Sequence, residues 1–154
     1  MTQPAGSQPN VEAIPRESAD VGLAAILLDT TVLIDLLRGR GGARSRLLGL
    51  RDRGDEAWAC AVNVEEVFRG LRSSEITSAQ NLISGLRIAP LGASEGRRAG
   101  AWRRDFAAEG TTLAQADCLI AAAAVGVKAR LATGNPKHFP MAEVGVDHWP
   151  AGES

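Results

Sequence analysis

Short apolar runs alternate along the chain with longer stretches in which apolar residues recur at helical spacing. The clearest run, Ala24–Leu28, is continuously apolar, which is typical of a strand buried on both faces of a parallel sheet. Residues 57–62 and 128–133 also predict strands, residues 87–91 predict a short strand, and residues 144–148 predict an edge strand. The chain therefore offers five strand segments, separated by longer segments of a different period.

The segments between these runs predict helices. We expect helices over residues 32–38, 43–53, 63–72, 74–86, 94–109 and 112–125. Thr30 or Thr31 is suited to cap the first of these helices, and Asn63 the third. Repeated strand–helix order predicts a three-layer α/β fold, in which a mostly parallel sheet is flanked by helices. In such folds, ligands bind outside the carboxyl ends of the strands.

The two ends of the chain differ from this alternating body. Residues 1–22 contain three prolines and few large apolar residues, so we expect a flexible extension there. The folded domain is expected over residues 23–150, and residues 150–154 are expected to be loosely held. The basic region and adjoining apolar stretch of a secretory signal are not found in the first segment.

Composition narrows the classes of protein that this chain can be. The chain has 154 residues, of which 45% are hydrophobic and 23% charged, with a net charge of -1. No run approaches the roughly 18 apolar residues that span a bilayer, which argues against a membrane protein. Two cysteines do not make a disulfide framework, so a reduced, cytoplasmic compartment is expected. Of the 17 basic residues, 15 are arginines, which can contact RNA phosphates or simply face solvent.

Three acids stand out by their positions. Asp29 directly follows the first buried strand, although a turn or helix-cap role fits it as well. Glu66 opens the helix after the second strand, where Asn63 and Glu66 also have the spacing of a capping box. Asp117 lies in a helix that is apolar nearly all round. A buried carboxylate there needs a metal, an arginine partner or protonation.

Asn135 follows the strand over residues 128–133, in a Gly-Asn-Pro sequence that is typical of a turn. Together with the three acids, it is expected near the carboxyl edge of the sheet. Clustered carboxylates repel one another, and a divalent cation with hard oxygen ligands, Mg²⁺ or Mn²⁺, relieves that repulsion. A metal held in this way suits phosphate chemistry, because it activates water and stabilises the charge on a phosphate.

Four segments resemble the motifs of PIN-domain ribonucleases, in particular the VapC-type toxins of bacterial toxin–antitoxin pairs. They are residues 27–37, 66–70, 117–122 and 133–139, which occur in the family's order and with its separations. The resemblance covers about residues 25–139. It implies that residues 23–150 form a PIN domain, with a PIN-like three-layer α/β/α fold.

The resemblance also assigns roles to individual residues. It implies that Asp29, Glu66 and Asp117 ligate Mg²⁺ or Mn²⁺, and that Thr30 and Thr133 orient the waters or substrate of the site. Asn135, in the fourth motif, would complete the catalytic set.

At that fourth position, Asn135 departs from the family, because many relatives carry Asp there. An amide is neutral and cannot act as a base, so it would bind a metal through water or hydrogen-bond the phosphate. Glu143, Asp105 or Glu109 could supply the missing charge, and spacing selects none of them.

The activity implied by the resemblance is metal-dependent endoribonuclease cleavage of RNA, leaving a 5′-phosphate and a 3′-hydroxyl, by the toxin of a toxin–antitoxin pair. A homodimer and a cognate antitoxin are implied as partners. The antitoxin would lie in an apolar groove, for which the helix over residues 32–37 and Leu47, Leu48 and Leu50 are candidate walls, or else plain core. Two alternatives stay open: a PIN nuclease with a non-toxin role, and an inactive PIN-like module that binds a partner.

Overall fold

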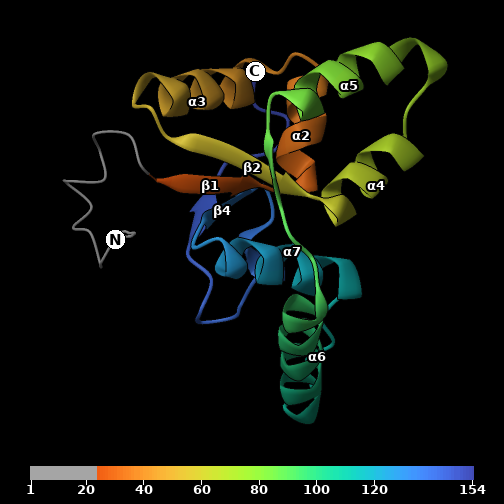
Figure 1. Ribbon diagram of the computed structural model, residues 1–154, viewed down its shortest axis with the longest axis vertical. Coiled ribbons are helices and arrows are strands. Elements are labelled where there is room, and N and C mark those ends of the chain that lie inside the picture. Colours follow the sequence, from red (N-terminus) through yellow and green to blue (C-terminus); the bar gives the residue numbers. More distant parts are fainter. Residues whose placement is uncertain (1–23) are drawn as a thin grey trace.

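Five strands form one sheet with the order β3-β2-β1-β4-β5 in a computed structural model that describes residues 24–154 (Figure 1). The strands are β1 (Ala25–Leu28), β2 (Glu56–Cys60), β3 (Arg87–Ala89), β4 (Arg130–Thr133) and β5 (Val146–His148). All neighbouring strands run parallel. The described chain starts in the central strand, adds β2 and β3 on one side, and then returns to add β4 and β5 on the other. The topological switch point of the sheet therefore lies between β1 and β4.

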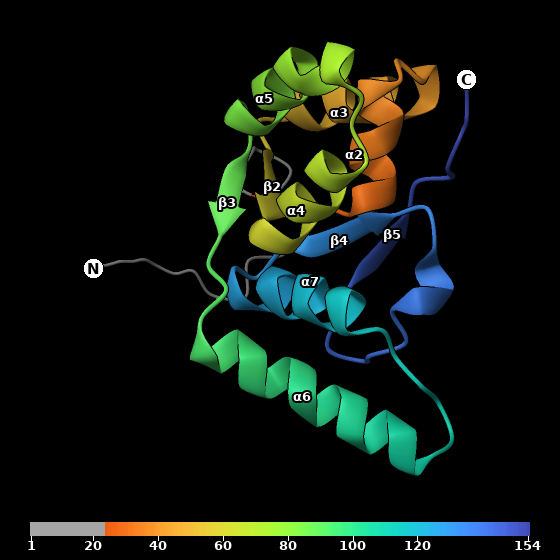
Figure 2. The same ribbon diagram turned by 90° about the vertical axis from the view of Figure 1, so that its right-hand side faces the viewer.

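Helices cover both faces of the sheet, which confirms the predicted three-layer α/β fold (Figure 2). One face carries α2 (Thr30–Leu37), α3 (Gly41–Asp52), α4 (Ala61–Arg69) and α5 (Ile76–Ser84), and the other carries α6 (Ala93–Ala108) and α7 (Gln115–Gly126). Two short 3₁₀ turns, η1 (Ser73–Glu75) and η2 (Pro136–His138), lie in connecting segments. None of the helices within residues 24–154 has the length and apolar character that crossing a bilayer requires.

The sheet separates two apolar cores, because successive strand residues point to opposite faces. In β1, Leu27 packs into the core beneath α6 and α7, while Ile26 and Leu28 pack into the core beneath α2 and α3. Residues 121–124 of α7 are all alanines and are almost completely buried. These small side chains let α7 lie close to the sheet, which fixes the position of its first turn near the carboxyl ends of the strands.

Several predicted element boundaries are wrong, and each has a local cause. β2 ends at Cys60 rather than at residue 62, so α4 begins at Ala61 and Asn63 lies inside its first turn. The first helix begins at Thr30, with Asp29 at the cap position, because the threonine hydroxyls are bonded elsewhere. The helix predicted from residue 112 begins at Gln115, since the preceding residues form the connection from α6.

The last residues of the chain are held in place, so the expectation of a loose segment over residues 150–154 is wrong. The Gly152 N–H donates to a carboxylate oxygen of Asp35 at 2.7 Å, and the Gly42 N–H donates to the Glu153 carbonyl at 3.1 Å. Polar and small residues dominate this segment, so its sequence carries no signal for these contacts. The extension expected over residues 1–22 lies outside the described residues.

We predict that replacing Ala123 with Leu will lower the free energy of unfolding by about 1–3 kcal/mol, because added methylenes strain a packed core. Ala123, on α7, is fully buried in the core that also contains residues of α6 and the sheet. Urea denaturation followed by circular dichroism measures the change. Ala108→Leu, at the exposed last residue of α6, is the matched control and should change stability by less than about 0.5 kcal/mol. Equal effects of the two substitutions would contradict the tight packing of the core around α7.

Candidate functional site: acids at the carboxyl edge of the sheet

Asp29 lies at the switch point, immediately after β1, and its side chain is buried. The neighbouring strand β4 ends in Thr133, whose hydroxyl donates to Asp29 Oδ2 at 2.7 Å. The Thr31 hydroxyl lies 3.4 Å from the same oxygen. The pairing of Leu28 with Ala132 brings the two strand ends side by side, so the sheet itself creates this contact. The structure therefore places Thr133, a predicted site residue, directly against Asp29.

The environment of Asp29 opposes its negative charge. Burial raises the pKa of this carboxyl group above its usual value, and the charge of Glu66 raises it further. The hydrogen bonds from Thr133, the Thr30 backbone and Thr31 act in the opposite direction and lower it, but they do not cancel the effect of burial. Ionisation of Asp29 therefore costs free energy in the folded protein, and a bound cation would lower that cost.

Glu66 is half-buried on α4 and accepts a hydrogen bond from the Thr30 hydroxyl at 2.6 Å. The Asn63 side-chain amide lies behind this hydroxyl, and its nitrogen donates to Thr30 Oγ1 at 3.3 Å. The Asn63 side-chain oxygen accepts the Cys60 N–H at 2.8 Å, so Asn63 is the residue that reaches back over the first turn. The capping interpretation of Glu66 is therefore wrong, because the end of β2 at Cys60 moves the capping position away from it.

Asp117 lies in the first turn of α7, where its side chain is partly buried. Burial raises the pKa of this carboxyl group, and the charges of Asp29 and Glu66 raise it further. His138, whose Nδ1 is 3.5 Å from Asp117 Oδ2, acts in the opposite direction. Among the described residues, no arginine pairs with Asp117, so the arginine-partner interpretation finds no support.

The fourth motif reaches the same corner through its backbone. The Asn135 N–H donates to Thr133 Oγ1 at 2.9 Å, and the Gly134 N–H donates to Thr31 Oγ1 at 3.0 Å. The Asn135 side chain is exposed and makes no hydrogen bond within residues 24–154. It is therefore near the acids and available to a ligand.

The three acids considered as substitutes for a charge at position 135 lie elsewhere. Glu143 accepts a hydrogen bond from the Trp102 indole, and Asp105 lies 3.6 Å from Arg104. Neither of these acids, nor Glu109, acts on the pKa of Asp29 or Asp117. The described site thus has three carboxylates and one amide.

These oxygen donors fit a hard divalent cation in their chemistry. Within residues 24–154, Glu66 accepts hydrogen bonds only at Oε1, and Asp117 meets His138 only at Oδ2, so each keeps a second oxygen for a ligand. No three His, Cys, Asp or Glu side chains in the described part are close enough to form a complete metal cage as placed. Mg²⁺ suits such an open arrangement, because it binds one or two carboxylates and keeps several waters.

Comparison with known proteins identifies the family. The family model of the PIN domain matches residues 26–144. The chain belongs to the PIN-domain family. Over 118 residues it is 36% identical to Ribonuclease VapC10 of Mycobacterium tuberculosis, covering 77% of this chain and 88% of that protein. Over 115 residues it is 33% identical to Ribonuclease VapC19 of the same organism, covering 75% and 92%.

Solved structures share the PIN fold. The DNA-bound VapBC of Salmonella typhimurium matches with a TM-score of 0.72 and 19% identity, over 82% of this chain and 98% of the matched chain. FitAcB of Neisseria gonorrhoeae matches with a TM-score of 0.65 and 27% identity, over 79% and 95%. The match to the Salmonella structure, at this low identity, supports the fold alone.

Some residues of this PIN domain were missed as site residues by the sequence analysis. Asn63 and Thr31 were considered only as helix caps, and His138 was given no role of its own within the motif over residues 133–139. Their positions follow from where β2 and β4 end, which the local sequence does not fix. The one available signal for His138 is its place three residues after Asn135, in the loop that leaves β4.

We predict that Asp117→Asn will stabilise the metal-free PIN domain at pH 7, raising its melting temperature by up to about 4 °C. The pKa of Asp117 is raised in the folded state, so its ionisation costs stability at every pH above the unfolded value of 3.8. The gain should shrink as the pH falls toward that value. Thermal unfolding in a chelator at pH 7 and near pH 4 measures it. Asp105→Asn, an exposed control, should show no gain, and destabilisation by Asp117→Asn at pH 7 would contradict the electrostatic description.

Proposed function

We propose that this PIN domain is a metal-dependent endoribonuclease that cleaves RNA phosphodiesters, and that it is the toxin of a toxin–antitoxin pair. The observation that carries the proposal is the corner formed by Asp29, Glu66 and Asp117. These residues come from three separate segments, repel one another, and have no arginine partner in residues 24–154. The relatives that are named ribonucleases support the same function.

Asp29, Glu66 and Asp117 would hold the divalent ion, for which we propose Mg²⁺, with Mn²⁺ as a substitute. When bound, such an ion lowers the pKa of its water and neutralises charge on the scissile phosphate and the leaving oxygen. Asp29 and Asp117 both have raised pKa values in the metal-free protein, so a cation would favour their ionised forms.

The hydroxyl groups of the chain prepare the site for this chemistry. Thr133 and Thr31 orient Asp29, and Thr30 orients Glu66, so these carboxylates need little rearrangement when they bind. The exposed Asn135 amide can donate a hydrogen bond to a phosphate oxygen, and because it is neutral it does not serve as a general base. In this proposal the threonines and Asn135 act only through hydrogen bonds, and the carboxylates act through their negative charge.

A groove beside the acids supports an antitoxin as the partner. It has a volume of about 100 Å³, lies between α2 and α4, and has an apolar floor that includes Ile34, Leu37 and Val67. Glu66 also lines the groove, so an apolar segment bound there would reach the acidic corner. We propose the antitoxin as its occupant.

The expectation about the groove walls is corrected in part. Leu47 and Leu50 on α3 are buried in the core, and Leu48 is half exposed on α3 and does not line this groove. Two further properties are proposed from the family resemblance: a homodimer, and action in the cytoplasm, where cellular RNA substrates are found.

The first test is cleavage of a mixed RNA pool in the presence and absence of Mg²⁺. We expect cleavage that stops in a chelator and returns with added Mg²⁺ or Mn²⁺. Asp29→Ala and Asp117→Ala should each lower the rate by about 100-fold or more, since each removes a proposed ligand of the ion. Gel electrophoresis of end-labelled RNA measures the rate.

Asp105→Ala is the matched control for this test, because it removes an exposed carboxylate from a surface pair on α6. It should cleave at the parent rate. Unchanged cleavage by Asp29→Ala or Asp117→Ala would contradict the proposed set of metal ligands. A parent protein that cuts only DNA would favour the non-toxin nuclease, and one that cuts nothing would favour the inactive partner-binding module.

The second test addresses the groove. Leu37→Glu places a charge on its apolar floor and should weaken binding of the cognate antitoxin by about 10-fold or more. Leu48→Glu adds the same charge to an exposed site on α3, outside the groove, and should bind like the parent. Isothermal titration calorimetry measures both affinities. Equal affinities for the two variants would show that the antitoxin docks elsewhere.

A further inference from the structure

A short segment after the last strand of the sheet passes beside the loop that leaves β4. Residues 149–153, called the strap here, run from beside β4 to α2 and α3 (Figure 2). At its start, the Trp149 N–H donates to the Thr133 carbonyl at 2.9 Å. At its centre, Ala151 lies so close to Gly134 that a Cβ added to Gly134 would be 3.0 Å from the Ala151 methyl group. The strap therefore contacts the loop that leaves β4.

Asp35 fastens the strap to α2. Its side chain is buried, with 8% of the residue exposed, although it lies inside a helix between apolar neighbours. A buried carboxylate needs a donor, and among the described residues that donor is the Gly152 N–H, at 2.7 Å and 117 positions away along the chain. No basic side chain in the described residues forms an ion pair with Asp35. Its carboxylate is thus satisfied by the strap.

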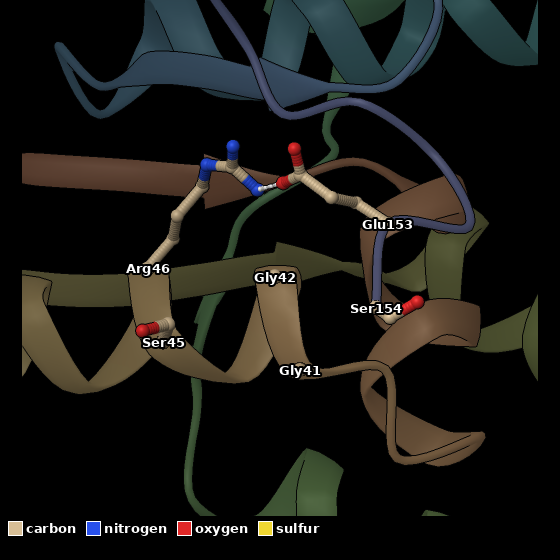
Figure 3. Close-up of a pocket in the computed structure, with 6 residues that line it drawn as sticks. All are labelled: Gly41, Gly42, Ser45, Arg46, Glu153 and Ser154. Carbon is tan, nitrogen blue, oxygen red and sulfur yellow. Dashed lines mark ion pairs between the residues drawn. The ribbon is translucent and has the colours of Figure 1, made fainter.

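The start of α3 provides the second attachment. The Gly42 N–H belongs to the first turn of the helix, where amide groups have no partner within the helix, and it donates to the Glu153 carbonyl at 3.1 Å. Arg46, one turn further on, pairs with the Glu153 carboxylate (Figure 3). A Cβ at Gly42 would lie only 2.5 Å from Glu153 Oε1 and 2.9 Å from its Cβ. A glycine at this position is therefore what lets the strap pass.

The strap reaches the acids only through other residues. It contacts Thr133 and Gly134, and these hold Asp29 and Thr31 through the Thr133 hydroxyl and the Gly134 N–H. It makes no hydrogen bond to Asp29, Glu66 or Asp117 within the described residues. The strap can therefore affect cleavage only by holding Thr133 and Gly134 in position.

We propose that the strap is a positioning element of the site, and that Asp35 is the positioning residue that fastens it. The strap contacts the Thr133–Gly134 backbone, and this contact keeps the Thr133 hydroxyl directed at Asp29. The inference rests on the proposed nuclease function for its kinetic consequence, but the docking of the strap itself is measurable without activity.

The first experiment compares Asp35→Ala with Asp35→Asn in the full chain. Alanine removes the acceptor for the Gly152 N–H, whereas the asparagine side-chain oxygen can still accept it. We expect Asp35→Ala to lower kcat for RNA cleavage by about 10-fold with KM changed by less than about 2-fold, since it misplaces the Thr133 hydroxyl that orients Asp29. Asp35→Asn should restore most of kcat.

Amide hydrogen exchange, followed by NMR, reads the structure independently of cleavage. In Asp35→Ala, the amides of Gly152, Gly134 and Asn135 should all exchange at least about 10-fold faster than in the parent, while those of the buried strand β1 stay protected. In Asp35→Asn, the three amides should keep most of their protection. A variant that fails to fold would lose β1 protection as well, so it is recognised directly.

A pair of glycines on α3 gives a second route to the same question. Gly42→Ala puts a methyl group against Glu153, whereas Gly49→Ala, on the same helix, meets only the end of the Arg53 side chain at 3.9 Å. Both changes replace a helical glycine with a better helix former. Only Gly42→Ala should release the strap, with faster Gly152 exchange and a lower kcat.

The exchange and kinetic measurements distinguish failure of the strap proposal from failure of the proposed function. If Gly152 exchanges rapidly in Asp35→Ala or Gly42→Ala while Asn135 exchange and kcat match the parent, the strap does not position the site and the proposal is wrong. The proposal is also wrong if Gly152 keeps its protection in both variants. If the parent cleaves no RNA, the proposed function fails, and exchange at Gly134 and Asn135 still decides whether the strap holds the loop.

Discussion

The hydrogen bond from Thr133 to Asp29 is the contact around which the candidate site is arranged. It joins the ends of two adjacent parallel strands at the switch point, and both side chains are almost completely buried. Because α2 and the segment after β4 pack on opposite faces of the sheet, the strand ends are open to a ligand while the side chains stay fixed. Burial opposes the charge of Asp29, and the nearby Glu66 adds to that opposition. The protein thus keeps an acid where folding alone disfavours one, as expected of a functional site.

The layered fold could be predicted because its signals are local. The apolar run of β1 and the nearly all-apolar α7 each reveal burial on all sides, and Asp29 and Asp117 stand out against those backgrounds. Glu66 was less clear, since the same residues fit a helix cap. The structure removes that ambiguity by ending β2 at Cys60, where its pairing with β3 also ends. The end of a strand depends on its neighbours in the sheet, so no reading of residues 60–66 alone could locate the cap.

The supporting contacts of the site were not predictable from local sequence. Thr133 and Asp29 are 104 residues apart, and threonines are common in turns and at strand ends. The strap over residues 149–153 has the composition of a loose end, and only its contacts with Asp35 and Gly42 show that it is held. The resemblance to the PIN family proposed the acids and Thr133 as site residues by position, and chemistry alone would not have selected Thr133. The sequence alone does not show which distant residues come into contact when the chain folds.

The order of the strands has a consequence for synthesis of the protein. β1 carries Asp29 and is made early, whereas its neighbour β4 and the strap are made near the end of the described chain. A nascent polypeptide on the ribosome therefore cannot form the contact between Thr133 and Asp29 until translation has passed Thr133. Copies that end before Thr133 lack the hydroxyl that contacts Asp29, which is the orienting group in the proposed endoribonuclease. The strand order thus makes synthesis of β4 a condition for forming this contact.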